Sequence, residues 1–411
     1  MRGISKRSSA SRSLAFFAFF LIACQPNDSE LDESVSVLSQ ENVLFRFSLN
    51  DSTEAVFDGQ RSGSDWSLFN GDETIALSAI NDTTWRVPVF NGSWVLTGDD
   101  DPLLYSGFWV DSMRSIGAPA YRVPLEVTAP TQPLIAPSTQ SAFISGTWDV
   151  WFGEPYATQP DAQLDIEQRS DGLHGTMRTP TGDYRYLKGG MVGDGLQLQT
   201  FDGAHLYVFT AQHDRGSWLN GRFFSGNHYQ TAWTGMPATP AEDVGAMATL
   251  EVPDNQLYAL FIGRDGGEDT LSLLSRNNEL IVLDVLGTWC PNCMDEVRLL
   301  TTLDHSGARF ISMAFERDTS TSANYRNLDR FAQEMGINWE LYWGGRADKK
   351  AAANAFPFLD QVISFPTTLF IQGNEVTVHS GFNGPATGRR YAIETKRFQN
   401  QLNRATSLGN H

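Results

Sequence analysis

Two cysteines in the C-terminal half of the chain have the spacing of a redox pair. Cys290 and Cys293 lie in the segment WCPNC at residues 289–293. An apolar run at 280–286 predicts a strand buried on both faces, and a helical period follows the segment. We therefore expect Cys290 at a helix N-terminus, where unpaired N–H groups and the helix dipole favour a thiolate. Cys293 lies deeper on the same face, which predicts that Cys290 attacks a partner disulfide and Cys293 resolves the mixed disulfide.

A structural zinc site is the main alternative for two cysteines at this spacing. Such a site needs four ligands. The only other cysteine lies near the N-terminus, and the seven histidines are scattered singly. We therefore expect no metal. The sequence has no haem or flavin motif, so the cysteine pair is the only redox group required and no cofactor is predicted. His205 is expected to be a packed strand residue rather than a ligand.

Two acidic residues flank the pair at positions where a carboxyl could handle protons. Asp284 lies inside the apolar run, where an unpaired acid is costly. Glu296 follows Cys293 by three residues, although an acid in a first helical turn is also ordinary dipole chemistry. A buried carboxyl beside a thiol should have a raised pKa and could relay protons. The neighbouring Asp295 is expected on the solvent-exposed face.

The segments GTWCPNC at 287–293 and FPTTLF at 365–370 resemble those of thioredoxin-fold proteins. They are most similar to the membrane-tethered periplasmic disulfide reductases of the TlpA/ResA type. The resemblance covers residues 245–411, some 40% of the chain. It implies a thioredoxin-like domain in which Trp289 and a cis Pro366 support the cysteine pair. The backbone at Phe365, Pro366 and Thr367 would then bind the substrate chain as an added strand.

The same resemblance implies roles for the two acids and for the partners. Asp284 falls where thioredoxins carry a buried aspartate that manages the proton of the second cysteine, and Glu296 matches a glutamate of the TlpA/ResA group. The implied activity is thiol–disulfide exchange, most simply the reduction of protein disulfides, with a membrane thiol transporter as electron donor. Two alternatives remain open: a peroxiredoxin-like thiol peroxidase, although the expected Pro-x-x-x-Thr/Ser-x-x-Cys pattern is absent, and a β-domain binding lipoprotein with a redox-sensing appendage.

Composition limits the classes of partner. The chain has 411 residues, of which 41% are apolar and 19% charged, enough for two or three folded domains. Acidic residues outnumber basic ones by 48 to 30, a net charge of −18. Nucleic acid is therefore not expected as a partner, because phosphate binding needs clustered Lys and Arg.

The N-terminus has the pattern of a secretory signal peptide over residues 1–23. A basic start precedes ten apolar residues at 14–23, too few to span a membrane as a stable helix. The run ends in Leu-Ile-Ala-Cys, which resembles a bacterial lipobox and implies lipidation of Cys24; an ordinary signal with a chance cysteine is the alternative. We expect a lipid-anchored, periplasm-facing envelope protein, with the outer membrane favoured because Gln25 differs from an inner-membrane retention aspartate. Residues 24–40 are polar and predict a flexible tether.

The rest of the chain divides into a β region and an α/β region. Short alternating runs broken by Gly, Asn and Asp predict an all-β sandwich or barrel. Eight of the eleven Trp lie before residue 245 and are expected in its core. Alternating strand and helix patterns then predict an α/β domain with a parallel centre and an antiparallel edge. The expected boundaries are 41–127 for β unit 1, 128–142 for a Pro-rich linker, 143–236 for β unit 2, 237–244 for a second linker and 245–411 for the thioredoxin-like domain.

Overall fold

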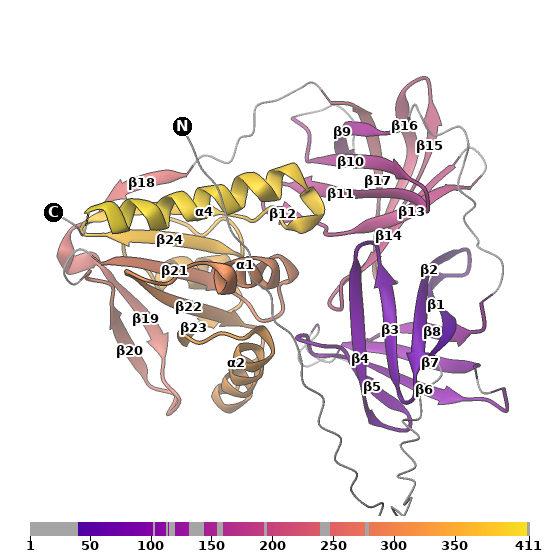
Figure 1. Cartoon of the computed structure of the whole chain (residues 1–411), viewed down its shortest axis with the longest axis horizontal. Helices are drawn as coiled ribbons and strands as arrows, with labels where there is room; N and C mark the ends of the chain where they lie inside the picture. Colours follow the sequence, from indigo (N-terminus) through magenta and orange to yellow (C-terminus); the bar gives the residue numbers. More distant parts are fainter. Residues whose placement is uncertain are drawn as a thin grey trace, which may run out of the picture. The chain divides into compact units, whose positions relative to one another are not determined.

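The computed structural model describes residues 40–101, 103–111, 114, 120–130, 144–153, 159–192, 195–238, 247–275 and 279–408. The predicted signal peptide, Cys24 and most of both Pro-rich linkers lie outside these residues. All described residues belong to one compact unit, Ser39–His411. Figure 1 shows the order of their elements along the chain.

The first β unit is a closed barrel of eight antiparallel strands. Closure comes from pairing of the first and last strands, with Phe45 opposite Val127. An eight-stranded barrel leaves just enough interior for side chains, and here Trp66, Trp94 and Trp109 fill it. The prediction of tryptophan in the core is thus confirmed. The strands are β1 (Gln40–Asn50), β2 (Thr53–Ser62), β3 (Asp65–Asn70), β4 (Glu73–Asn81), β5 (Thr84–Arg86), β6 (Gly92–Gly98), β7 (Tyr105–Asp111) and β8 (Tyr121–Thr128).

The second β unit is also a closed ring, since β10 pairs with both β9 and β11. Its core contains Trp148, Trp218 and Trp233. Both units are therefore barrels, and the sandwich alternative is wrong. The two-residue strand β12 continues from a turn at the end of β11. The strands are β9 (Gly146–Phe152), β10 (Ala162–Arg169), β11 (Gly172–Thr179), β12 (Gly182–Asp183), β13 (Leu187–Val192), β14 (Gly195–Phe201), β15 (Leu206–Asp214), β16 (Ser217–Ser225) and β17 (Tyr229–Pro237).

The C-terminal part is a mixed eight-stranded sheet in the order β18-β25-β24-β21-β22-β23-β19-β20. The central strands β21, β22 and β23 are parallel, and β24, β25 and β18 form an antiparallel edge as predicted. The strands are β18 (Ala248–Glu251), β19 (Tyr258–Ile262), β20 (Glu268–Ser272), β21 (Leu280–Leu286), β22 (Ala308–Glu316), β23 (Glu340–Arg346), β24 (Thr367–Gln372) and β25 (Glu375–Ser380). The helices are α1 (Pro291–Thr302), α2 (Thr321–Met335), α3 (Lys349–Asn354) and α4 (Arg389–Leu408).

Helices cover both faces of this sheet. Alternate residues of β21 enter separate cores, Ile281 against the face packed by α3 and Val282 against the face packed by α1 and α4. The strand is buried along its whole length, as its uniform apolar run predicts. Helix α2 ends where Gly336 adopts a left-handed conformation at φ 69°, the backbone that glycine accepts most easily. No helix in the described part of the chain is long and apolar enough to cross a membrane.

The barrels and the α/β part share buried contacts. One apolar cluster contains residues of the first barrel, Phe201 of β14 in the second barrel, and the apolar face of α1. The ring of Phe201 stacks on Phe47 at 5.1 Å between centroids. On the α2 side, the Glu334 carboxylate pairs with Arg86 and accepts from the backbone N–H of Val89 at 2.5 Å.

Candidate active site

Cys290 and Cys293 form a disulfide at the start of α1. Cys290 is the N-cap residue, and its Sγ accepts a hydrogen bond from the Cys293 N–H at 3.2 Å. Pro291 occupies the first helical turn, where its missing N–H costs nothing. Cys290 is 5% exposed and Cys293 is 0% exposed. The structure therefore places the pair as the sequence predicts, with the second sulfur deeper.

The segment at 365–367 lies beside the outer sulfur. Cys290 Sγ is 3.6 Å from the carbonyl oxygen of Phe365, and the Phe365–Pro366 peptide bond is cis. The Pro366 carbonyl accepts from the Gly381 N–H at 2.9 Å, and Thr367 Oγ1 donates to the Ser364 carbonyl at 2.8 Å. Pairing of β24 with β21 thus brings Phe365 next to Cys290, although the two residues are 75 positions apart in the sequence.

Trp289 covers one side of the disulfide and is tightly held. Its indole N–H donates to the Phe315 carbonyl at 2.9 Å, and its ring meets Phe365 edge to face at 5.6 Å. The Arg317 guanidinium lies 4.5 Å from the ring centroid. A Cβ at Gly287 would overlap this indole, so glycine is required there.

Asp284 lies directly under α1, in the middle of the sheet. It is opposite Ser312 of β22 and Thr368 of β24, and Ser312 Oγ donates to its Oδ2 at 3.4 Å. Its Oδ1 has no hydrogen-bond partner among the described residues. Burial raises the pKa of Asp284 to about 8. The expectation of a buried acid with a raised pKa is confirmed here.

Glu296 points from α1 into the same polar row. Its carboxyl is fully buried and accepts a short hydrogen bond from Thr368 Oγ1. Burial and then the charge of Asp284 raise the pKa of Glu296 well above its usual value. Two buried carboxyls this close disfavour ionising together, so the pair holds at least one proton near neutral pH. Such a pair can accept or return the proton of a buried thiol.

The polar row continues to the sheet edge. His379 lies opposite Thr368 on β25, and its Nε2 is 3.1 Å from Glu394 Oε2 on α4. Burial raises the pKa of Glu394, but His379 and the amide of Asn383, at 2.7 Å, outweigh it and the pKa is lowered. Glu394 is therefore a fixed negative charge that further opposes ionisation of Glu296.

Sequence reasoning missed a third buried acid, Glu316. It ends β22, and its two oxygens accept from the N–H and hydroxyl of Thr288 at 2.9 and 2.8 Å. Burial raises its pKa to about 7 against these hydrogen bonds. An acid at the end of an otherwise apolar strand was the available signal. Its effect is to hold the turn that carries Trp289.

The expectation for Asp295 is wrong. It is 2% exposed, because Arg185 of the second barrel covers it at 3.0 Å. Burial raises the pKa of Asp295 to about 7 despite Arg185 and, at 3.2 Å, Arg298. Burial by itself would lower the pKa of Arg185, but the negative charges of Asp295 and Glu73 together have a larger effect, so the Arg185 pKa is raised. This partner lies 110 positions away along the chain, so helical periodicity could not reveal it.

His205 is packed, as expected, although it lies just outside the strand. It lies directly before β15, with Nδ1 at 3.2 Å from Asp202 and its ring stacked on Tyr207 at 5.1 Å. Both His205 and Tyr207 line a cavity of about 240 Å³ that opens over Cys290. The second barrel therefore contributes part of the wall of the candidate site.

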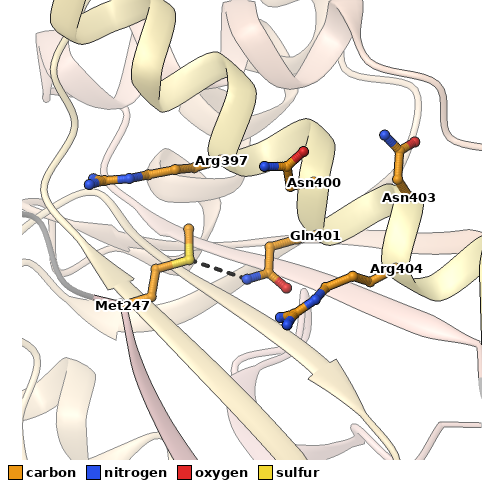
Figure 2. A pocket seen from close by; sticks show the side chains of 6 residues that line it. All are labelled: Met247, Arg397, Asn400, Gln401, Asn403 and Arg404. Carbon is orange, nitrogen blue, oxygen red and sulfur yellow. Dashed lines mark hydrogen bonds between the residues drawn. The ribbon is translucent and has the colours of Figure 1, made fainter.

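A larger hollow of about 520 Å³ lies against α4. Figure 2 shows Arg397 and Arg404 on the helix above it, with the amide of Gln401 donating to the Met247 sulfur at 3.3 Å. None of its lining residues is a cysteine or an acid. No group of three or more potential metal ligands occurs among the residues that the structure describes. The cavity over the disulfide is therefore the candidate active site.

Comparisons with known proteins give a coarse likeness. No family model and no curated protein matches the chain. Similar solved structures include the thioredoxin domain of a thiol-disulfide oxidoreductase from Bacteroides vulgatus, 12% identical over 38% of this chain and 98% of that one, with a TM-score of 0.24. Another is an Aquifex aeolicus protein named for electron transfer, 16% identical over 38% and 98%, also with a TM-score of 0.24.

Proposed function

We propose that this protein is a thiol–disulfide oxidoreductase that reduces disulfides through the Cys290–Cys293 dithiol. The observation that carries the proposal is the disulfide at the N-terminus of α1, with its outer sulfur at the floor of a cavity and its inner sulfur buried. Helix N-termini stabilise thiolates, so the outer cysteine is the nucleophile. The buried acids Asp284 and Glu296 would hold and return the proton of the inner cysteine.

The reaction is a two-electron exchange. The Cys290 thiolate attacks one sulfur of the substrate, the substrate S–S bond breaks, and one thiol leaves. The Cys293 thiolate then attacks Cys290, releases the second thiol and closes the protein disulfide. The substrate gains two electrons and two protons, both from the dithiol. A further thiol must re-reduce the protein disulfide, and a membrane thiol carrier would serve in the predicted envelope location.

The envelope setting remains part of the proposal. The basic and apolar start of the chain and Cys24 support a lipid anchor facing the periplasm. Protein disulfides are the substrate that the family resemblance implies. The net negative charge of the chain argues against nucleic acid as a partner, because binding to phosphates needs clustered basic side chains.

The test is the reactivity of the two single-cysteine variants. In a Cys24→Ala background, Cys293→Ser leaves the outer sulfur and Cys290→Ser leaves the inner one. We expect the first variant to be thiolated by cystamine, a small aliphatic disulfide, about 100-fold faster than the second, because only the outer sulfur both borders the cavity and lies at the helix terminus. The two variants are matched, since each removes one sulfur. Equal rates would contradict the assigned roles, and inert sulfurs in both would contradict the proposed function.

A further inference from the structure

The cavity over the disulfide is built by two parts of the chain. Trp289, Cys290 and Phe365 form its α/β side. The turn at residues 179–184 and the start of β15 form the opposite side. Its volume of about 240 Å³ is below the range of roughly 300–1,000 Å³ typical of sites for drug-sized ligands.

The barrel side of this cavity is fixed by buried polar contacts. Asp183 Oδ2 accepts from the Gly384 N–H at 2.6 Å, in the segment that follows β25. Arg185 is 1% exposed and donates to the Pro291 carbonyl at 3.2 Å, within the first turn of α1. The same guanidinium pairs with Glu73 of the first barrel at 2.6 Å. Both barrels therefore hold the turn at 179–184 against the cysteine helix.

The backbone of the 179–184 turn lies very close to the residues around the cysteine pair. Gly182 has φ +136°, and a Cβ there would overlap the side-chain amide of Asn292, the residue between the two cysteines. On the other side, a Cβ at Gly381 would lie 3.3 Å from the Thr181 backbone. The backbone of the 179–184 turn is therefore packed against both the cysteine helix and the residue that follows β25.

We propose that the substrate of this site is a low-molecular-weight disulfide, with no more than one or two residues on each side of the S–S bond. This inference rests on the proposed function. A protein encounter of even modest size buries several hundred Å² on each partner, whereas the cavity leaves Cys290 only 5% exposed. The aromatic rings of Trp289, Phe365 and Tyr207 suit the methylene groups beside a small disulfide, and Lys349 supplies a cation for its carboxylate.

The chemistry is the exchange described above with a free disulfide as oxidant. Cys290 displaces one small thiol and forms a mixed disulfide inside the cavity. Cys293 then displaces the second small thiol, and the Cys290–Cys293 bond reforms. Both leaving groups are small enough to exit without movement of the barrel.

The experiment compares two disulfides and three variants of the full chain. The reduced protein is mixed with cystine, which has one residue on each side of its S–S bond, or with insulin, and the rate of disulfide formation is followed through intrinsic tryptophan fluorescence. Arg185→Gln loosens the barrel side of the cavity. Thr181→Trp narrows the cavity at an exposed turn position, and Gln212→Trp places the same side chain at an exposed position further along β15.

We expect wild type to react with cystine at least 100-fold faster than with insulin. Arg185→Gln should lower this ratio at least tenfold by admitting insulin. Thr181→Trp should slow the reaction with cystine at least tenfold, whereas Gln212→Trp should leave that rate within twofold. Comparable wild-type rates with both disulfides would overturn the inference and leave the proposed function intact, as would a Thr181→Trp variant as fast as wild type. Reaction with neither disulfide would instead refute the proposed function.

Discussion

The charge of Asp284 should make the folded protein less stable as the pH rises. Its pKa is raised to about 8 in the folded state, and its ordinary value is 3.8. Between these values the folded protein keeps a proton that the unfolded chain has lost. Stability from this proton is fully present below the ordinary pKa and is lost as the pH rises through the folded pKa. Each pH unit in this window changes the free energy of unfolding by about 1.4 kcal/mol.

Substitution Asp284→Asn removes this proton linkage while keeping the side-chain shape. From about pH 5 to pH 8 the wild type should lose on the order of 4 kcal/mol more stability than the variant. The free energy of unfolding of the variant, relative to that of wild type, should therefore increase steadily as the pH rises. Glu296 acts in the same direction, so the variant should keep part of the pH dependence.

The assay is urea unfolding of the oxidised chain, in which the disulfide removes both thiols from the titration. Far-UV circular dichroism follows the α/β part, because the α-helices of the described chain all lie between 291 and 408. Asp254→Asn is the matched control, since it removes the same charge from an exposed position. Parallel pH profiles for wild type and Asp284→Asn would refute the reasoning, because they would mean that folding does not change the proton affinity of this carboxyl.

Three further predictions concern Glu316, Gly287 and Trp94. Glu316→Gln should reduce the loss of folding free energy between about pH 4.5 and pH 7, because burial raises the pKa of Glu316 to about 7 in the folded protein. Urea unfolding across this pH range measures the loss, and a slope equal to that of wild type would contradict the prediction. Gly287→Ala should displace the Trp289 indole from its hydrogen bond at a cost of about 1–3 kcal/mol, visible as a shift in tryptophan emission, and an unshifted spectrum would count against the packing argument. Trp94→Ala should cost about 3–5 kcal/mol by leaving a cavity in the first barrel, and a loss below about 1 kcal/mol in thermal unfolding would show that the barrel collapses around it.

Local patterns in the sequence were sufficient for the elements that carry the cysteines. The apolar run at 280–286 is β21 with the predicted bounds, and Cys290 is the N-cap of α1. Gly336 ends α2 in the left-handed conformation. These features depend on neighbours within one or two helical turns or on one strand, so the information for them is contiguous in the chain.

The burial of Asp295 could not be found this way. Its helical neighbours predict an exposed acid, and the residue that covers it, Arg185, belongs to another barrel. Arg185 itself has a positive φ of 55°, a turn conformation that no motif in its sequence predicts. An acid on a helix face is buried or exposed according to what packs on that face, and this depends on the tertiary structure.

By itself, the sequence determined where the proposed redox site lies, because the cysteine pair, the start of its helix and the acids Asp284 and Glu296 fall within thirteen residues. It also determined that the β region is built from short alternating strands. Only the tertiary structure decided that these strands close into two barrels, since closure depends on pairs such as β1 with β8 that lie far apart in the chain. It alone decided that the second barrel forms the wall of the disulfide cavity, because that contact is made by charges and backbone groups whose partners lie about 100 to 200 positions away.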